Sequence, residues 1–413
     1  MNRIFSNRNF LLLWASQVVE QLGNGLNLMA MIAWVIAFSD DPAVNTAGMS
    51  LLMASMGVPI ALFGPFAGVL VDRLKKKHIL LLSGIARSVF VLVTYLIIGS
   101  KQLPALVFVF VFLISVAAQV VLPGRSSFMP LLVRKKSLLQ ANSISAITAQ
   151  ALQLTGMAAG GLIVAKIGVA DALMINFFTF ALSVVLLVLI RKKEILPEGR
   201  SGQFKSVFAD VAAGFNAMLT GAKTVFYIRR ITLFMALTGF FYIAFTGNFL
   251  SIILKNGGIT MAPIAALSVV LMFISAGFVA GLFMVRKLER VFGEVNIFRA
   301  VFPLIGLFLA GLVFSKNFYY LLFICFVIGI CAVVFLGLAE TSLQNNTDKD
   351  VRGRVFAAYH ILKDGGLILS SSLAGIMMPF IGHGGMILTV AAVFAGYGLV
   401  NLLAAVLFKL KNS

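Results

Sequence analysis

Two carboxylates lie deep inside long apolar runs of this 413-residue chain, Glu20 and Asp364. Each is about ten residues into its run, or ~15 Å along a helix, near the middle of a hydrocarbon layer about 30 Å thick. A charge at that depth is costly and usually functional. Three amides share the helix face of Glu20 at helical spacing: Gln17, Asn24 and Asn27. We therefore expect Glu20 to be a proton-coupling carboxylate beside cavity amides. The alternative is a hydrogen-bonded structural glutamate between helices.

Asp364 belongs to a second group of titratable residues, in which His360 is one helical turn away and Lys363 is adjacent. An acid, an imidazole and an ammonium within one turn can pass a proton, or they can neutralise one another as a static ion pair. The spacing leaves both possibilities open. We count His360 and Asp364 with the proton-coupling residues and Lys363 with the substrate cavity. Weaker cavity candidates lie in other apolar runs: Gln119, Gln150, Gln153 and Tyr242.

The composition places these residues in a membrane. Hydrophobic residues make up 61% of the chain and charged residues 11%, whereas a soluble domain is about half apolar and a quarter charged. These values exclude a soluble globular protein, a disordered chain and a disulfide scaffold. A spanning helix needs about 20 apolar residues, and twelve runs meet that need. We predict an all-α polytopic membrane protein with spans at 9–38, 46–71, 79–100, 104–124, 138–166, 170–190, 229–254, 261–285, 296–314, 318–339, 354–380 and 384–408.

The basic residues predict the orientation. Lys and Arg total 33 against 14 acids, which gives a net charge of +19. With a cytoplasmic N-terminus, 26 of the 33 fall in inner segments, 4 in outer loops and 3 inside spans. The positive-inside rule therefore predicts a multi-pass protein of the cell (inner) membrane with both termini in the cytoplasm. Since topology accounts for the basic excess, we expect no nucleic-acid partner.

The chain divides into two six-span halves, 1–190 and 229–413. The segment 191–228 between them is predicted to be a cytoplasmic linker with an amphipathic interfacial helix. The halves repeat, since Gly168 closes the fifth span and Gly382 closes the eleventh, 214 residues later. Parallel repeats of this kind place a substrate site near the midplane between the halves.

Several catalytic signatures are absent from the sequence. It has no P-loop, no G-x-S-x-G elbow and no His/Cys metal spacing. We therefore expect no enzymatic activity, no metal and no cofactor. Energy for any transport must come from an ion gradient, from the gradient of the substrate, or from a partner.

The stretch from Gly68 to Lys77, GVLVDRLKKK, resembles the loop signature G-x-L-x-D-R-x-G-R-K of the major facilitator superfamily, between its second and third helices. Lys75 stands where the signature has its second glycine. The number of spans and the repeat extend the resemblance over the whole chain. The resemblance implies the major facilitator fold, with twelve helices in two pseudo-symmetric halves.

Within the superfamily, the chain resembles the drug:proton antiporter branch of macrolide-efflux and enterobactin-export proteins. Four stretches carry this resemblance: NFLLLWASQVVEQLGNGL, PGRSSFMPLLV, ANSISAITAQALQLTGMAAGGLIV and VRGRVFAAYHIL. In that branch an acid commonly stands where this chain has Asn24, one turn after Glu20. Many drug antiporters also carry an arginine in the fourth helix, where this chain has LISVAAQ.

The resemblance also implies a conformational latch at the cytoplasmic membrane edge, made by Gly68, Asp72 and Arg73. Arg125 and Glu340 end the predicted fourth and tenth spans at nearly symmetric positions. They are candidate latch partners, although terminal charges can also be solvated. Arg87 lies within the third span and needs a partner that the sequence does not name.

These features favour a monomeric secondary active transporter. We expect proton-coupled efflux of hydrophobic or amphiphilic compounds, of the drug, macrolide or siderophore type, by alternating access. The partners would be a small hydrophobic or amphiphilic substrate, protons and the lipid bilayer. The main alternative is a lipid or lysolipid flippase, and a membrane sensor or scaffold that moves nothing is a further one. The buried acids, the loop signature and the duplicated halves favour transport.

Overall fold

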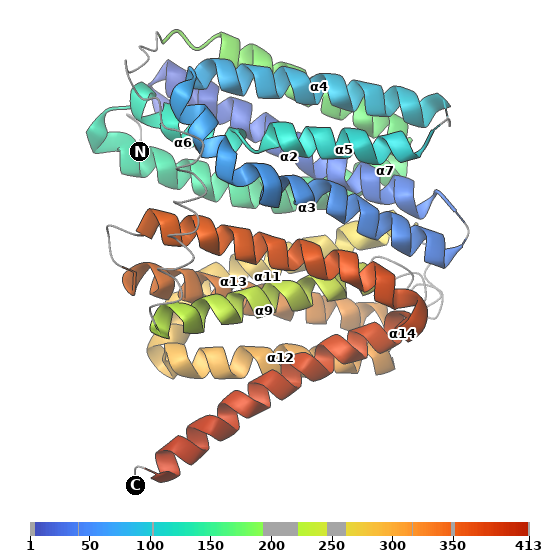
Figure 1. Cartoon of the computed structure of the whole chain (residues 1–413), viewed down its shortest axis with the longest axis vertical. Coiled ribbons are helices and arrows are strands. Elements are labelled where there is room, and N and C mark those ends of the chain that lie inside the picture. Colours follow the sequence, from blue (N-terminus) through green and yellow to red (C-terminus); the bar gives the residue numbers. More distant parts are fainter. Residues whose placement is uncertain are drawn as a thin grey trace. The chain divides into compact units, whose positions relative to one another are not determined.

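The computed structural model describes residues 5–39, 41–100, 103–192, 222–245, 262–315, 317–347 and 352–411, and every longer element in them is an α-helix (Figure 1). Each of the twelve predicted spans overlaps a helix, and the predicted all-α fold class is confirmed. The helices are α2 (Arg8–Ile36), α3 (Pro42–Arg73), α4 (Lys76–Ser100), α5 (Ala105–Ala118), α6 (Val121–Leu132), α7 (Lys135–Val188), α9 (Ala222–Ala244), α11 (Pro263–Phe292), α12 (Glu294–Ser315), α13 (Phe318–Asn345) and α14 (Arg352–Lys411).

The helix ends follow from local sequence. Pro263 is the first residue of α11, where its missing N–H costs nothing. The same helix ends at Gly293, whose φ of 73° suits a residue without Cβ. The side chain of Asn317 caps α13 by accepting hydrogen bonds from the backbone N–H groups of Tyr319 and Tyr320.

Two bends repeat along the chain. Gly168 divides α7 with φ 87°, and Gly382 divides α14 with φ 72°. Each of these helices therefore holds two predicted spans. Two further glycines, Gly25 and Gly239, are also 214 residues apart. A Cβ on either would clash with a neighbouring helix, α7 for Gly25 and α14 for Gly239. The repeat found in the sequence thus corresponds to repeated backbone geometry.

Within the described residues, nine helical stretches are long and apolar enough to cross a membrane. The stretches in α7 and α14 each run through the glycine bend, so each combines two predicted spans. Helix α2 is not among the nine, because the polar face around Glu20 lowers its hydropathy.

The fourth span is longer than predicted. Its expected end at residue 124 is wrong, because α6 continues from α5 as far as Leu132 and the apolar stretch covers Ala105–Leu132. Pro123 is the third residue of α6, where the helix has no N–H partner to lose, so it does not stop the helix. The fourth span therefore contains an arginine after all, Arg125.

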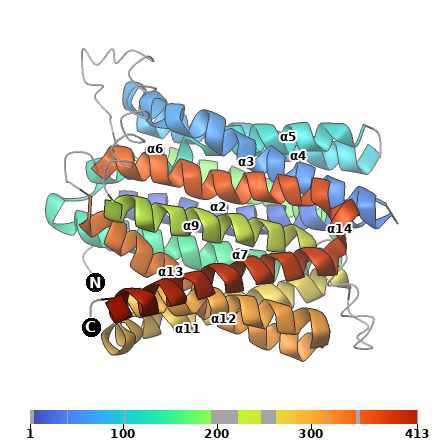
Figure 2. The ribbon, with the colours of Figure 1, turned by 60° about the horizontal axis from the view of Figure 1, so that its bottom comes forward.

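The chain forms two compact units. The first comprises 1–35, 51–216 and 356–365, and the second comprises 36–50, 217–355 and 366–413. In the first unit α4 packs along α5 and α7 (Figure 1). In the second unit α13 packs along α9, α11 and α12 (Figure 2). The predicted linker helix lies outside the described residues, and the predicted domain boundaries stay a prediction.

Candidate functional site

Glu20 lies in the middle of α2, ~18 Å along the helix from Arg8. Two kinds of contact hold this helix against α7. Gly25 lies directly against the backbone of Gly156, where a side chain would not fit. Gln17 donates from Nε2 to the carbonyl oxygen of Ser145 at 2.9 Å and accepts from the Ser145 hydroxyl at 2.5 Å. Together these contacts turn Glu20 toward α4 and α6.

Glu20 is the centre of a buried ion triad. Arg87 of α4 approaches Glu20 Oε1 with its Nη1 at 2.9 Å, and Arg125 of α6 approaches Oε2 with its Nη2 at 2.5 Å. The exposed fractions of Glu20, Arg87 and Arg125 are 3%, 2% and 7%. Each carboxylate oxygen therefore has its own guanidinium partner, and one side chain joins three helices.

Further contacts fix Arg87 more firmly than Arg125. The guanidinium carbon of Arg87 lies 4.6 Å from the ring centre of Phe180, and its Nε donates to the Ser83 carbonyl oxygen at 3.4 Å. The Ser183 hydroxyl donates to Glu20 Oε2 at 3.5 Å. Arg125 makes its hydrogen bond with Glu20 alone among the described residues, and its Nε is buried without a partner there.

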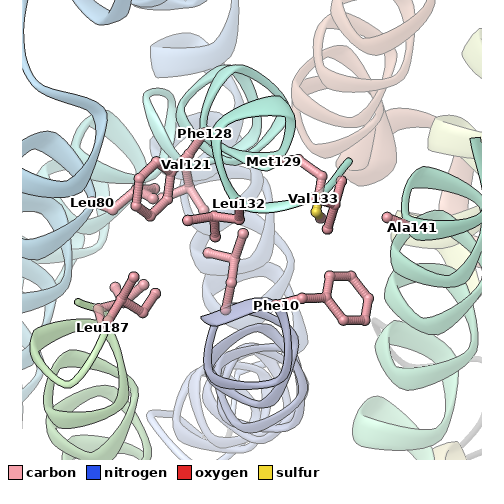
Figure 3. Close-up of a cluster of buried hydrophobic side chains, with 11 residues drawn as sticks. Phe10, Leu80, Val121, Phe128, Met129, Leu132, Val133, Ala141 and Leu187 are labelled. Atoms are coloured by element: carbon pink, nitrogen blue, oxygen red, sulfur yellow. The ribbon is translucent and has the colours of Figure 1, made fainter. Parts of the chain in front are cut away.

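A cluster of buried apolar side chains next to the triad brings α2, α4 and α6 together (Figure 3). Leu13 is seven residues before Glu20, and Leu80 is seven before Arg87. Phe128 of α6 belongs to the same cluster. Gly124 helps, because a Cβ there would come within 3.0 Å of Leu80. The glycine thus allows α6 to approach α4 at the position that places Arg125 beside Glu20.

The triad forms part of the wall of a cavity of about 370 Å³ within the first unit. This volume is at the lower end of the range of about 300–1,000 Å³ found for small-molecule sites. Gln17, Gln21 and Asn24 continue the polar wall along α2. Leu122, which is 79% exposed, also lines the cavity. The cavity lining therefore combines ionic and polar side chains with apolar ones.

The structure brings some of the predicted site residues together and leaves others apart. Gln17 and Asn24 line the cavity beside Glu20, whereas Asn27 is buried one turn further along α2. Gln119 is half-buried and donates to the Ser115 carbonyl oxygen. The remaining candidates lie elsewhere: Gln153 is exposed on α7, Tyr242 is half-buried on α9, and the Lys363 ammonium lies 5.7 Å from the ring centre of Tyr359. The side chains of Gln150, His360 and Asp364 lie outside the described part of the structure.

Arg125 differs most from its predicted role. It does not end the fourth span as an edge charge, since it is buried within α6 and paired with Glu20. Glu340 is half-buried within α13, five residues before that helix ends. Of the other latch candidates, Gly68 has open space around it, Arg73 is the last residue of α3, and the side chain of Asp72 lies outside the described part.

Glu20 also differs from the isolated acid that its sequence neighbours suggest. Its two basic partners come from residues 67 and 105 positions away, so no local pattern reveals them. The depth of Arg87 in its span was the available signal, since a buried guanidinium requires an acid. No sequence feature indicated Phe180 or Ser183.

Chemically, the triad is a site whose charge can change. It is not a nucleophile or a metal site. Among the described residues, no group of three or more His, Cys, Asp or Glu could hold a metal ion. The carboxylate can bind a proton, and both guanidinium groups can bind an anion. Any change in the charge of Glu20 affects the contacts of three helices at once, because Glu20 joins α2, α4 and α6. Such a site suits a membrane transporter.

The chain belongs to the Major Facilitator Superfamily, which its residues 13–371 match. It is a multi-pass membrane transporter of that family. Among relatives, it is 29% identical over 204 residues to the uncharacterised MFS-type transporter YfiS of Bacillus subtilis; that alignment covers 49% of this chain and 47% of YfiS. It is 24% identical over 401 residues to macrolide efflux protein A of Streptococcus pyogenes, covering 93% of this chain and 94% of that protein.

A solved structure supports the fold. The nucleoside transporter NupG is similar with a TM-score of 0.68 over 98% of each chain, at 16% sequence identity. At a sequence identity this low, the similarity shows the fold alone. The major facilitator fold expected from the loop signature is thus confirmed.

Proposed function

We propose that this chain is a proton-coupled exporter of hydrophobic or amphiphilic compounds that works by alternating access. It would act in the cell (inner) membrane with both termini in the cytoplasm. The observation that carries the proposal is one buried carboxylate, Glu20, that joins two arginines from other helices in the wall of a cavity. The similarity to macrolide efflux protein A supports efflux as the direction.

Protonation of Glu20 would couple the proton gradient to the helices. When Glu20 is ionised, its ion pairs hold α4 and α6 to α2. A proton removes its charge and weakens both pairs, so the three helices can change their spacing. In the proposed cycle, the substrate moves outward while Glu20 is ionised, and the protonated protein returns empty. His360 and Asp364 are the second candidate pair for this role.

The experiment is transport by purified protein in liposomes with an imposed pH gradient and a panel of hydrophobic compounds. Glu20→Gln keeps the size of the side chain and removes its titration. We expect this variant to lose gradient-driven transport by at least about tenfold while substrate still binds, because general acid–base groups contribute at least that much where a proton must move. Asp171→Asn is the matched control, since Asp171 is an exposed acid on α7 outside the cavity. It should transport as the unchanged protein does.

Full pH-driven transport by the Glu20→Gln variant would contradict the assignment of Glu20. His360 and Asp364 would then be the coupling residues, and the same assay on His360→Gln and Asp364→Asn would decide between them.

A second candidate function is a lipid or lysolipid flippase. Leu122 favours it, because this residue lines the cavity and is also exposed, so an acyl chain could remain in the membrane while the headgroup binds the polar residues of the cavity. Adding a fluorescent lysolipid to the panel distinguishes the two functions. A flippase would move the lysolipid between leaflets, and an exporter would move soluble compounds.

A further inference from the structure

The cavity in the first unit has more positive than negative charge. Three of its described lining residues are charged, Glu20, Arg87 and Arg125. Two guanidinium groups face one carboxylate, so the wall carries one uncompensated positive charge. All three residues are more than nine-tenths buried. A buried charge without a partner is costly, and proteins ordinarily provide a counter-charge or a ligand for it.

The uncompensated charge is best assigned to Arg125. Arg87 is enclosed by the Phe180 ring, the Ser83 carbonyl oxygen and Glu20. Arg125 has its bond to Glu20 and a buried Nε with no partner among the described residues. It lines the cavity and has free hydrogen-bonding capacity, because a guanidinium has five N–H donors.

We propose that the ligand of this cavity is an amphiphile with a single anionic group, a carboxylate or a phosphate, which pairs with Arg125. An arginine fork matches both groups in geometry. The apolar part of the ligand would lie along Val121, Leu122 and Met129, which line the cavity on the same helix as Arg125. The assignment rests on the proposed function only in taking this cavity as the substrate site.

Charge balance supports a monoanion over a cation or a neutral compound. A bound monoanion gives two positive and two negative charges, and the loaded cavity becomes neutral. An exporter would then move no net cavity charge outward against an inside-negative membrane potential. A cationic ligand would instead raise the net positive charge of the cavity, and it would have to displace an arginine to reach Glu20.

The test is equilibrium binding to the full chain in phosphatidylcholine nanodiscs without any gradient. Three probes each contain an unbranched chain of twelve carbons: dodecanoate, dodecanamide and dodecylammonium. A lysophosphatidate with the same chain distinguishes a lipid headgroup from a free carboxylate. We expect each anion to bind at least about tenfold more tightly than dodecylammonium, the scale expected for one unit charge near a partly buried partner.

Two variants should shift anion binding in opposite directions. Arg125→Gln leaves the neutral Glu20–Arg87 pair and should weaken dodecanoate binding about tenfold. Glu20→Gln leaves two positive charges and should strengthen it, which a merely misfolded variant would not do. Arg134→Gln is the matched control, because Arg134 is exposed just beyond α6 and does not line the cavity. It should bind as the unchanged protein does.

Equal affinity for the three alkyl probes would overturn the proposal, as would unchanged dodecanoate binding in the Arg125→Gln variant. The result is independent of the transport assay. Selective anion binding without pH-driven transport would contradict the proposed coupling and support this site. Transport without anion selectivity would support the proposed coupling and contradict this site.

Discussion

Glu20 in the first unit and Phe234 in the second are 214 residues apart, the spacing of the repeat, yet their surroundings differ completely. Glu20 is enclosed by two arginines. Phe234 is enclosed by rings, with centroids 6.1 Å from Phe302, 4.8 Å from Phe335 and 5.9 Å from Phe394. The residues one repeat after Arg87 and Arg125 are Val301 and Ala339, both buried. The same level of the repeat is therefore ionic in one unit and aromatic in the other.

At the apolar cluster next to the triad, the pattern is reversed. In the first unit this level holds the apolar cluster with Leu13, Leu80 and Phe128. One repeat later the corresponding residues are polar: Tyr227, Glu294 and Ser342. The Ser342 hydroxyl donates to Glu294 Oε1 at 2.5 Å, and the Tyr227 hydroxyl also hydrogen-bonds to Glu294.

The ring cluster and the ion triad, although at equivalent positions of the repeat, therefore make different contributions. Aromatic pairs contribute roughly 0.5–1.5 kcal/mol each beyond their buried area, so the ring cluster stabilises the middle of the second unit. A buried ion triad contributes little net stability, because desolvation offsets the attraction. What the triad adds is sensitivity to charge. Under the proposed function, the middle of the first unit responds to a proton or an anion through Glu20 and Arg125, whereas Phe234 and its ring neighbours carry no titratable group.

The largest effect is expected from removing the carboxylate. Glu20→Leu leaves two buried guanidinium groups without a counter-charge, which should cost about 3–5 kcal/mol of unfolding free energy. Phe234→Leu, the equivalent change in the second unit, keeps an apolar core but loses three ring pairs worth about 0.5–1.5 kcal/mol each, so it should cost less, about 1.5–3 kcal/mol. Equilibrium unfolding in mixed micelles measures both. Equal losses of unfolding free energy in the two variants would show that the regions around Glu20 and Phe234 are both stabilised by packing alone.

A triple substitution can replace the ion triad of the first unit with the equivalent apolar side chains of the second. Glu20→Phe, Arg87→Val and Arg125→Ala together give the first unit the side chains of the second. Replacing a buried ion triad with apolar residues is often neutral or stabilising. We expect the triple variant to recover at least about 2 kcal/mol relative to Glu20→Leu, while transport and anion binding are lost.

Unfolding free energy and transport are measured on the same preparation. A triple variant less stable than Glu20→Leu would mean that the first unit needs its ions for folding. One that still transports would remove the triad from the mechanism.

The helices were predictable from the sequence because lipid imposes a minimum apolar length, and each expected span overlaps a helix. The errors lie where a local signal has two meanings. Pro123 and Gly124 indicate a turn, but at the start of a helix a proline is tolerated, so α6 continues past Arg125. Gly168 and Gly382 were recognised from their repeat, and both carry the bend.

The site was predictable to a smaller extent. Helical spacing identified the polar face of α2, because residues three and four apart share a face. The partners of Glu20 could not be found in this way, since Arg87 and Arg125 reach it only through the packing of α4 and α6 on the apolar cluster. Local periodicity determines which way a side chain faces on its own helix, and not which helix it meets.

The smallest effects compare two hydroxyl groups that bond to carboxylates. Ser342 donates to Glu294 at 2.5 Å, while Ser183 donates to Glu20 at 3.5 Å, where two arginines already satisfy the carboxylate. A hydrogen bond to a charged group is worth about 1.5–3 kcal/mol, and much less at the limit of distance. Ser342→Ala should therefore lower the unfolding free energy by about 1.5 kcal/mol, and Ser183→Ala by less than about 0.5 kcal/mol. The same unfolding assay measures both, and a larger loss for Ser183→Ala would mean that Glu20 depends on its hydroxyl neighbour as well as on its arginines.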